Sequence, residues 1–359
     1  MGEGMHGLPA RRCHSPSIRH GTPCWPRPAR PPRPSLAEVA RSSLGPGLDG
    51  ILVVDKPIGP TSHDIVSLVR RLAATKRVGH GGTLDPFASG VLPVFLGRAT
   101  RVVEFHLADR KAYRATICFG ASSSTDDLEG EMTPSDGPAP DRATVEGVFA
   151  RFTGTISQRP PAYSAIKVRG RRAYAMARAG ETVELKDRQV TIEALSLASW
   201  DDSEPDRPVA VVDVVCSAGT YVRALARDLG TTVGNAAYLG ALRRTAAGSF
   251  AESDAVSMDV VRAATADGPD GLVPLLRAID EGLERFPRVQ LTPSEVDAVA
   301  QGQYVKPAAG IPTGADHYRL IDEGARLVAI AVPAGGGRLA PDKVLVAAPG
   351  TAATLTVGA

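Results

Sequence analysis

The stretch GHGGTLDPFASGVLP, residues 79–93, places one carboxylate in a loop of small and apolar residues. Asp85 stands between Leu84 and Pro86, with His80 five residues upstream. An aspartate before a proline in a glycine-rich loop is most often a turn or cap residue. The loop lacks both the Lys-Ser/Thr ending of a phosphate-binding P-loop and the spacing of a dinucleotide-binding turn. The stretch alone therefore leaves a turn aspartate and a catalytic carboxylate open, and disfavours a phosphate loop.

The segments around this loop predict an α+β domain. Apolar or alternating runs typical of strands occur at 51–54, 113–119 and 209–216. Apolar residues recur with helical spacing after Thr61 or Ser62, either of which can cap a helix, and again over 221–229. Strands and helices do not follow the regular order of a doubly wound sheet, so we expect a mixed, largely antiparallel sheet flanked by helices.

The composition is typical of a soluble, cytoplasmic protein. The 359 residues carry a formal net charge of +2 and only four cysteines, which lie far apart and do not suggest a disulfide scaffold. No apolar run has the length of a membrane span, and no secretory signal pattern is present. Residues 1–48 are rich in Arg and Pro. Such a composition predicts a disordered tail, because it cannot bury enough apolar surface.

A smaller module is expected after residue 285. In LTPSEVDAVAQGQ, residues 291–303, Thr292 and Glu295 can form a capping box around Pro293, and Gly302 can end the helix. Short strands are expected at 318–322, 325–332 and 343–348. The predicted organisation is therefore a tail (1–48), a main domain (49–285) and a small β-rich module (286–359).

A basic segment at 151–180 points to nucleic acid. It holds seven Arg or Lys and no Asp or Glu, and Phe152, Tyr163 and Tyr174 are interleaved with the cations. Cations for phosphates and flat rings for bases suit RNA, although a solvated loop and helix face is the alternative. The acidic stretch 126–141 is expected to face solvent and to say nothing about function.

Taken together, the segments resemble the bacterial tRNA pseudouridine synthases of the TruB family. The aspartate loop extends to GHGGTLDPFASGVLPVFLGRATR and departs from the family pattern only mildly, at Gly82, Phe87, Ser89 and Arg98. The other matching segments follow in family order: DGILVVDKPIGPTSHDIV (49–66), KAYRA (111–115), RPPAYSAIKVRGRRAYAMARAGE (159–181), CSAGTYVRALARDLG (216–230) and YLGALRRTAAGSF (238–250). Residues 286–359 resemble the PUA-like RNA-binding domain that ends many members.

The resemblance implies a pseudouridine synthase fold with a small, β-barrel-like PUA domain at the C-terminus. It also implies isomerisation of the T-arm uridine of tRNA, position 55, to pseudouridine by base flipping and an aspartate nucleophile. Substrate and product are isomers, so we expect no cofactor and no metal ion. We expect tRNA as the partner, no membrane, no obligate protein partner and a monomer.

The resemblance also assigns roles to residues. Asp85 matches the nucleophile, Arg223 the arginine that pairs with it, and Tyr113 the tyrosine that stacks on the uracil and can take the proton from C5. A carboxylate that must stay ionised in a dry pocket needs such a cation, and Arg suits a planar, bidentate pair. Without the resemblance, Tyr113 could equally be a core residue and Arg223 a surface residue.

Further residues are expected to contact the substrate. His80 matches the histidine that fills the space of the flipped nucleotide, and Leu242 matches an apolar residue of the uracil pocket. A loop histidine and a core leucine are the alternatives. Tyr221 is expected near the aspartate, and Lys56 is either a phosphate contact or a structural residue. Candidates for contacts with the tRNA backbone are Lys167, Arg169, Arg171 and Arg172.

Three other functions compete with this one. A non-catalytic RNA-binding module would keep the basic segment and the C-terminal module, but it would be free to lose Asp85, Tyr113 or Arg223, and all three are present. Related synthases with other RNA targets share the aspartate. A nucleotide-binding enzyme that uses GHGGT as a phosphate loop is the least supported, because the P-loop ending is absent.

Overall fold

The computed structural model describes residues 48–164, 167–168, 171–172, 176, 185–308 and 310–347. The predicted tail 1–48 therefore lies almost entirely outside the described residues. The described chain falls into two compact units. We call Ala112–Arg243 the Arg223 unit, and residues 48–111 together with 244–347 the Asp85 unit.

The sheet of the Asp85 unit is built on two long antiparallel strands. β1 (Gly50–Lys56) pairs with β3 (Ser89–Leu96) from Gly50↔Leu96 to Lys56↔Gly90. The strand order is β14-β1-β3, with the end of β12 next to β3. The shorter strands are β2 (Val78–His80), β13 (Phe250–Ala251), β14 (Val256–Ser257) and β15 (Leu276–Arg277). β14 runs parallel to β1, so the sheet is mixed.

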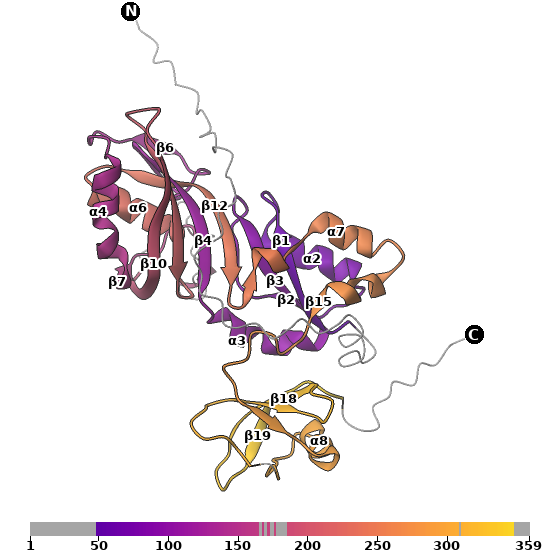
Figure 1. Cartoon of the computed structure of the whole chain (residues 1–359). Coiled ribbons are helices and arrows are strands. Elements are labelled where there is room, and N and C mark those ends of the chain that lie inside the picture. The colour runs from indigo at the N-terminus through magenta and orange to yellow at the C-terminus, as the bar shows by residue number, and fades with distance from the viewer. Residues whose placement is uncertain are drawn as a thin grey trace, which may run out of the picture. The chain divides into compact units, whose positions relative to one another are not determined.

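Helix α2 (Ser62–Leu72) covers this sheet. It begins with a capping box between Thr61 and Asp64, which satisfies orphan backbone N–H groups of the first turn. Its apolar stripe, Ile65, Val66 and Val69, is buried in one core with residues of β1 and β3. Figure 1 shows α2 and α7 beside β1. The other helical elements are η1 (Gly97–Val102), α3 (Val103–Leu107), η2 (Glu252–Asp254), α7 (Met258–Ala264) and η3 (Pro269–Leu275).

The Arg223 unit has strand order β12-β4-β11-β10-β7. These strands are β4 (Lys111–Phe119), β7 (Gly154–Gln158), β10 (Arg188–Asp201), β11 (Val209–Cys216) and β12 (Ala237–Ala247). Helix α4 (Arg142–Phe152) packs on β10 and on α6 (Val222–Thr232). Two small hairpins complete the unit: β5 (Ala121–Ser123) with β6 (Met132–Pro134), and β8 (Lys167–Val168) with β9 (Arg171–Arg172).

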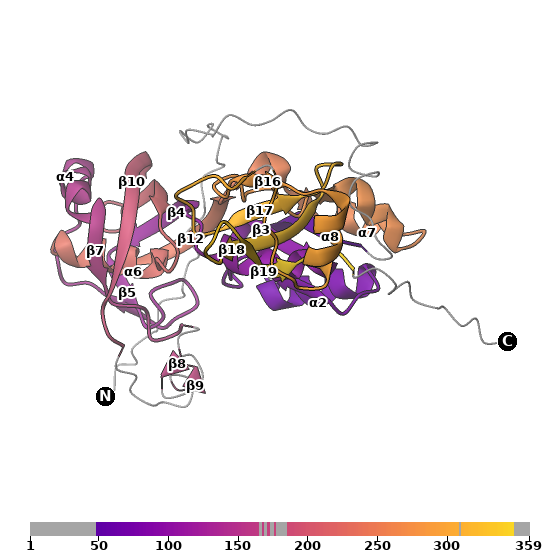
Figure 2. The same ribbon diagram turned by 90° about the horizontal axis from the view of Figure 1, so that it is seen from below.

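The C-terminal residues of the Asp85 unit form a separate four-stranded sheet, shown with α8 in Figure 2. Its strands are β16 (Arg288–Gln290), β17 (Tyr318–Ile321), β18 (Leu327–Pro333) and β19 (Leu339–Val344). Helix α8 (Pro293–Ala300) has the predicted capping box between Thr292 and Glu295. The last strand begins at residue 339 rather than at the predicted 343, because its first residues pair with the end of β18, from Pro333↔Leu339 and Val332↔Ala340 onward.

The predicted fold class is confirmed: the chain is α+β, with a large mixed sheet flanked by helices and a small C-terminal sheet. Among the described residues, no helix is long and apolar enough to cross a membrane. The domain boundaries at 285 and 286, and the PUA-like assignment of the C-terminal module, stay predictions.

Candidate active site

The loop that carries Asp85 leaves β2 and enters β3, and buried side chains bind its backbone on both sides of the aspartate. The hydroxyl of Ser62, at the start of α2, donates to the carbonyl of Leu84 at 3.0 Å and accepts from its N–H at 2.8 Å. The carbonyl of Asp85 itself accepts from the N–H of Ala88 at 3.1 Å. The aspartate thus sits in a turn, as its neighbours predict, and this turn is fixed to helix α2.

Lys56, the last residue of β1, fastens the other side of the loop. Its side chain is fully buried, and Nζ donates to the carbonyls of Ala88 at 2.6 Å, Pro57 at 2.9 Å and Pro86 at 3.4 Å. Burial lowers the pKa of Lys56 to about 8, while the Asp85 carboxylate acts to raise it. The burial of Lys56 favours the structural alternative, and a contact with a phosphate group stays a prediction.

Arg244 of β12 is a second buried cation at the loop, and the sequence prediction missed it. Its side chain is 1% exposed, and Nε donates to the carbonyl of Val91 at 2.7 Å. Its Nη atoms donate to the carbonyls of Gly82 at 3.1 Å and Thr83 at 3.4 Å. A signal was present: Leu242, Arg244 and Ala246 alternate along β12 and are all buried. An arginine at an inward strand position requires specific partners.

His80 accepts a hydrogen bond at Nδ1 from the N–H of Gly82, at 3.2 Å. Burial, with a further contribution from the positive charge of Arg244, lowers the pKa of His80. The imidazole is therefore neutral at physiological pH, with the proton on Nε2. A neutral, flat ring beside the aspartate loop has the properties that stacking on a base requires.

Tyr113, Tyr221, Arg223 and Leu242 lie in the Arg223 unit. Tyr113 is half-buried on β4, and Leu242 is 8% exposed on β12. Tyr221 is the N-cap residue of α6, where its N–H donates to Oε1 of Gln158 at 2.9 Å and its carbonyl accepts from Nε2 of Gln158 at 3.1 Å. The N-terminus of α6, and with it Arg223, is thereby fixed to the end of β7.

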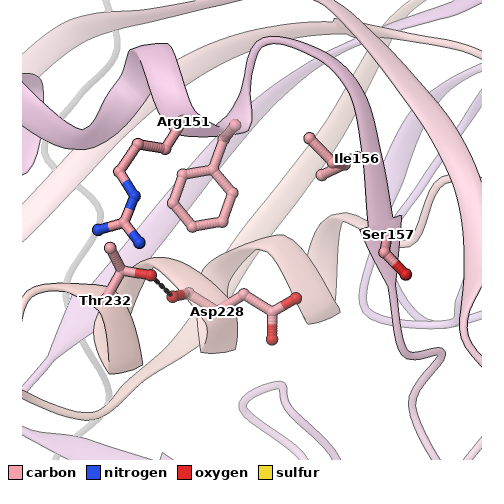
Figure 3. Close-up of a pocket in the computed structure, with 6 residues that line it drawn as sticks. Arg151, Ile156, Ser157, Asp228 and Thr232 are labelled. Atoms are coloured by element: carbon pink, nitrogen blue, oxygen red, sulfur yellow. Dashed lines mark hydrogen bonds between the residues drawn. The ribbon is translucent and has the colours of Figure 1, made fainter.

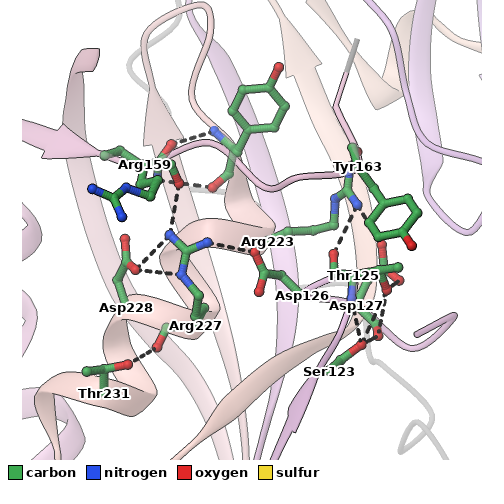
Figure 4. A network of polar contacts seen from close by, with 12 residues as sticks. Ser123, Thr125, Asp126, Asp127, Arg159, Tyr163, Arg223, Arg227, Asp228 and Thr231 are labelled. Atoms are coloured by element: carbon green, nitrogen blue, oxygen red, sulfur yellow. Dashed lines mark hydrogen bonds and ion pairs between the residues drawn. The ribbon is translucent and has the colours of Figure 1, made fainter. Parts of the chain in front are cut away.

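Arg223 is a buried arginine rather than a surface one. Its Nη1 forms an ion pair with Oδ2 of Asp127 at 2.9 Å, and the two side chains are 7% and 3% exposed. Arg223 also donates to the carbonyls of Thr125 at 3.1 Å and Tyr163 at 3.0 Å (Figure 4). Asp85 and Arg223 belong to different units, so their predicted pairing stays a prediction.

The expectation that the acidic stretch 126–141 faces solvent and carries no information is wrong at its first two residues. Asp127 is buried against Arg223, and Asp126 forms an ion pair with Arg227 at 2.8 Å. Nothing local marks these carboxylates, because their partners follow nearly a hundred residues later in the chain.

The predicted RNA-contact residues lie between β7 and β10. Lys167 pairs with Arg172, and Val168 with Arg171, in the β8–β9 hairpin. Arg171 is exposed. Arg169, and the side chains of Lys167 and Arg172, lie outside the described residues, so these contacts stay predictions.

A pocket of about 360 Å³ in the Arg223 unit contains none of the predicted site residues. Figure 3 shows it between the end of α4, β7 and α6, with Arg151 and Asp228 among its lining residues. No group of three or more His, Cys, Asp or Glu side chains in the described part of the chain could hold a metal ion.

Comparisons with known proteins identify the family of the chain. Residues 70–222 match the TruB family pseudouridylate synthase N-terminal domain, and residues 223–284 match the tRNA pseudouridylate synthase B C-terminal domain. The tRNA pseudouridine synthase B of Bradyrhizobium diazoefficiens is 40% identical over 309 residues, which cover 84% of this chain and 88% of that protein. The tRNA pseudouridine synthase B of Thermobifida fusca is 45% identical over 266 residues, which cover 72% of this chain and 87% of that protein.

Solved structures share the fold. The crystal structure of a Cbf5-Nop10-Gar1 complex contains a chain that is 26% identical, with a TM-score of 0.62 over 86% of this chain and 92% of that chain. The identity to these relatives and the coverage of both family domains leave one conclusion: the chain belongs to the TruB family of pseudouridylate synthases.

Proposed function

We propose that this protein is a tRNA pseudouridine synthase that isomerises the T-arm uridine at position 55, with Asp85 as the catalytic carboxylate. The observation that carries the proposal is the family membership over most of the chain together with the presence of Asp85, Tyr113 and Arg223 at the family's motif positions. A binding module without catalysis would not need all three side chains.

The reaction breaks the N1–C1′ bond of uridine and forms a C5–C1′ bond to the same uracil. The carboxylate of Asp85 attacks C1′ of the ribose, and the N1–C1′ electron pair leaves with the uracil. The uracil turns in the pocket and its C5 attacks C1′, which expels the carboxylate. Tyr113 takes the proton from C5, and N1 gains one, so substrate and product contain the same atoms.

Asp85 must be held in place and ionised for this chemistry. Three buried side chains from outside the loop, those of Lys56, Ser62 and Arg244, bind backbone groups of the loop on both sides of Asp85. This arrangement favours catalysis because an attacking atom displaced by about 1 Å can lower the rate by two orders of magnitude. The predicted pairing with Arg223 would supply the cation that a desolvated carboxylate needs.

The target uridine lies inside a folded arm, so it must leave its stack before C1′ can be attacked. The neutral imidazole of His80 is suited to take the vacated place, and Leu242 is suited to the uracil pocket. The basic segment 151–180 supplies cations for the backbone of the T arm. The enzyme acts as a monomer and without an obligate protein partner in this proposal.

The proposal is tested with the purified chain and an unmodified tRNA transcript. After incubation, pseudouridine is mapped along the RNA, and a second transcript with cytidine at position 55 serves as the control. Pseudouridine at position 55 of the first transcript and nowhere in the second is the expected result. Pseudouridine at other positions would overturn the T-arm assignment, and its complete absence would overturn the synthase activity.

A further inference from the structure

Two arginines of α6 contact two consecutive aspartates. Arg223 and Arg227 are four residues apart on the helix, so both point from the same face. Arg223 pairs with Asp127 at 2.9 Å, and Arg227 pairs with Asp126 at 2.8 Å. Figure 4 shows both arginines and both aspartates in one polar network. Arg223, which has an assigned catalytic role, thus belongs to one of two neighbouring ion pairs between α6 and the two aspartates.

The backbone of Asp126 is shaped for this double contact. Successive side chains of an extended chain point to opposite faces, which would send one of the two carboxylates away from α6. Asp126 instead has a left-handed conformation, with φ of 62°, which Asp and Asn adopt more readily than other side chains except glycine. Its N–H donates to the carbonyl of Ser123 at 3.1 Å, and its carbonyl accepts from the N–H of Leu239 at 3.0 Å.

The same two arginines bind the start of the connection between β7 and β10, residues 159–187. Arg227 Nη2 donates to the carbonyl of Arg159 at 2.8 Å, and Arg223 Nη2 donates to the carbonyl of Tyr163 at 3.0 Å. The connection leaves and re-enters the sheet at one point, because Gln158 and Arg188 are paired there. Its first five residues are therefore fixed along α6, ahead of the residues predicted to contact tRNA.

The Arg227–Asp126 pair has a poor energetic rationale as a stabilising contact alone. Burial raises the pKa of Asp126, against the opposing effects of Arg227 and Arg223. Replacing a desolvated ion pair as a whole often changes stability little, so a role in fixing geometry is the hypothesis for this pair.

We propose that Arg227 and Asp126 are positioning residues for pseudouridine formation: their ion pair fixes the start of the RNA-binding connection to the helix face that carries Arg223, so that tRNA bound by the connection meets a correctly placed Arg223. This inference rests on the proposed synthase function. It assigns a role to Arg227 and Asp126 that involves no contact with the uridine.

The test compares Arg227→Gln, Asp126→Asn and the double variant with the wild type. Asp126→Asn keeps a residue that tolerates the left-handed conformation and removes only the charge. Three quantities are measured: the dissociation constant for unmodified tRNA transcript, the single-turnover rate of pseudouridine formation at saturating enzyme, and the midpoint of thermal unfolding. The control is Arg142→Gln, which breaks an exposed pair with Glu146 on α4 in the same unit.

We expect each single variant to lose about ten- to a hundredfold in the single-turnover rate at saturation, and the double variant to lose no more than the larger single loss. Each single variant leaves one partner of the pair without the other, so its unfolding midpoint should fall, whereas the midpoint of the double variant should stay close to that of the wild type. Arg142→Gln should match the wild type in all three quantities. Arg227→Lys keeps the charge but replaces the three guanidinium nitrogens with one ammonium nitrogen, so it should recover part of the rate even if Arg227→Gln folds poorly.

A loss confined to tRNA affinity, with the saturated rate unchanged, would overturn the positioning role. A lower unfolding midpoint with a normal rate for the folded protein, or additive losses in the double variant, would overturn it as well. Wild-type protein that forms no pseudouridine would instead contradict the synthase function itself, so the two failures are distinguishable.

Discussion

At the scale of single residues, polar side chains around Asp85 form hydrogen bonds with backbone carbonyls of the loop that carries it. Lys56, Ser62 and Arg244 are buried, and between them they bind carbonyls of the loop from Gly82 to Val91. A buried polar group of this kind is costly unless every hydrogen bond is made. The loop is thereby restricted to one geometry, which is what a carboxylate aimed at a single carbon atom requires.

Tyr113→Phe tests the proton transfer from C5. The substitution removes only the hydroxyl from a half-buried ring on β4, so stability and tRNA affinity should be retained while pseudouridine formation stalls. Tyr318→Phe is the matched control, because its hydroxyl donates to the carbonyl of Pro312 at 2.6 Å in the C-terminal module. That control should lose about 1 kcal/mol of unfolding free energy and keep its turnover. Equal turnover by both variants would exclude the hydroxyl of Tyr113 from the reaction.

The pKa of Lys56 predicts a pH-dependent stability. Its value of about 8 in the folded chain lies below the ordinary 10.5, so between these two pH values the unfolded chain binds a proton that the folded chain does not. The contribution of Lys56 to stability is therefore present above pH 10.5 and falls by about 3 kcal/mol as the pH drops to 8. Urea unfolding of the wild type and Lys56→Met checks this. The stability difference between the two proteins should shift in favour of the wild type from pH 8 to pH 10, and a constant difference would contradict it.

At the scale of elements, the backbones of β3 and the end of β12 approach closely at Gly90, and this approach fixes the position of Arg244 on β12. Gly90 has φ of 104°, and a Cβ there would lie 2.2 Å from the carbonyl oxygen of Arg244. Gly59 has a similar φ of 110°, but a Cβ there would meet nothing within 4 Å. Both glycines thus have a φ in the region that favours glycine, and only Gly90 has neighbouring atoms that an added Cβ would overlap.

Gly90→Ala should therefore destabilise the chain more than Gly59→Ala, by about 3 kcal/mol, because both carry the left-handed strain and only the first adds overlap with backbone. Urea unfolding of the two variants measures the difference. Equal losses of unfolding free energy would show that β3 and β12 can separate at this point, and that their close approach does not fix the backbone of Arg244.

Features set by neighbouring residues could be predicted at this scale, and features set by distant ones could not. The predicted capping box at Thr292 depends on a residue three positions away and is confirmed. Of the two candidate caps for the first helix, Thr61 is the one that the structure shows. The burial of Asp127 depends on Arg223, 96 residues later, so its neighbours in the sequence suggested an exposed acidic stretch. Lys56 was ambiguous for the same reason, because its carbonyl partners at Pro86 and Ala88 lie about thirty residues away.

At the scale of the whole molecule, the nearly neutral net charge of +2 conceals a local excess of cations at 151–180. Binding of tRNA by this segment should release counterions and weaken with salt. Arg171→Gln, an exposed position on β9, should reduce the slope of log affinity against log salt by about 0.7 to 0.9. Arg142→Gln, whose charge is compensated by Glu146, should leave the slope unchanged. Identical slopes for Arg171→Gln and the wild type would place the tRNA backbone elsewhere.

The most direct test of the catalytic role of Asp85 is single-turnover pseudouridine formation by Asp85→Asn on a saturating excess of enzyme over tRNA transcript. The amide keeps the size of the side chain and loses the charge that attacks C1′. We predict no pseudouridine on the time scale of complete conversion by the wild type, with tRNA affinity and unfolding midpoint retained. Pseudouridine at a rate close to that of the wild type would contradict the assignment of Asp85 as the nucleophile.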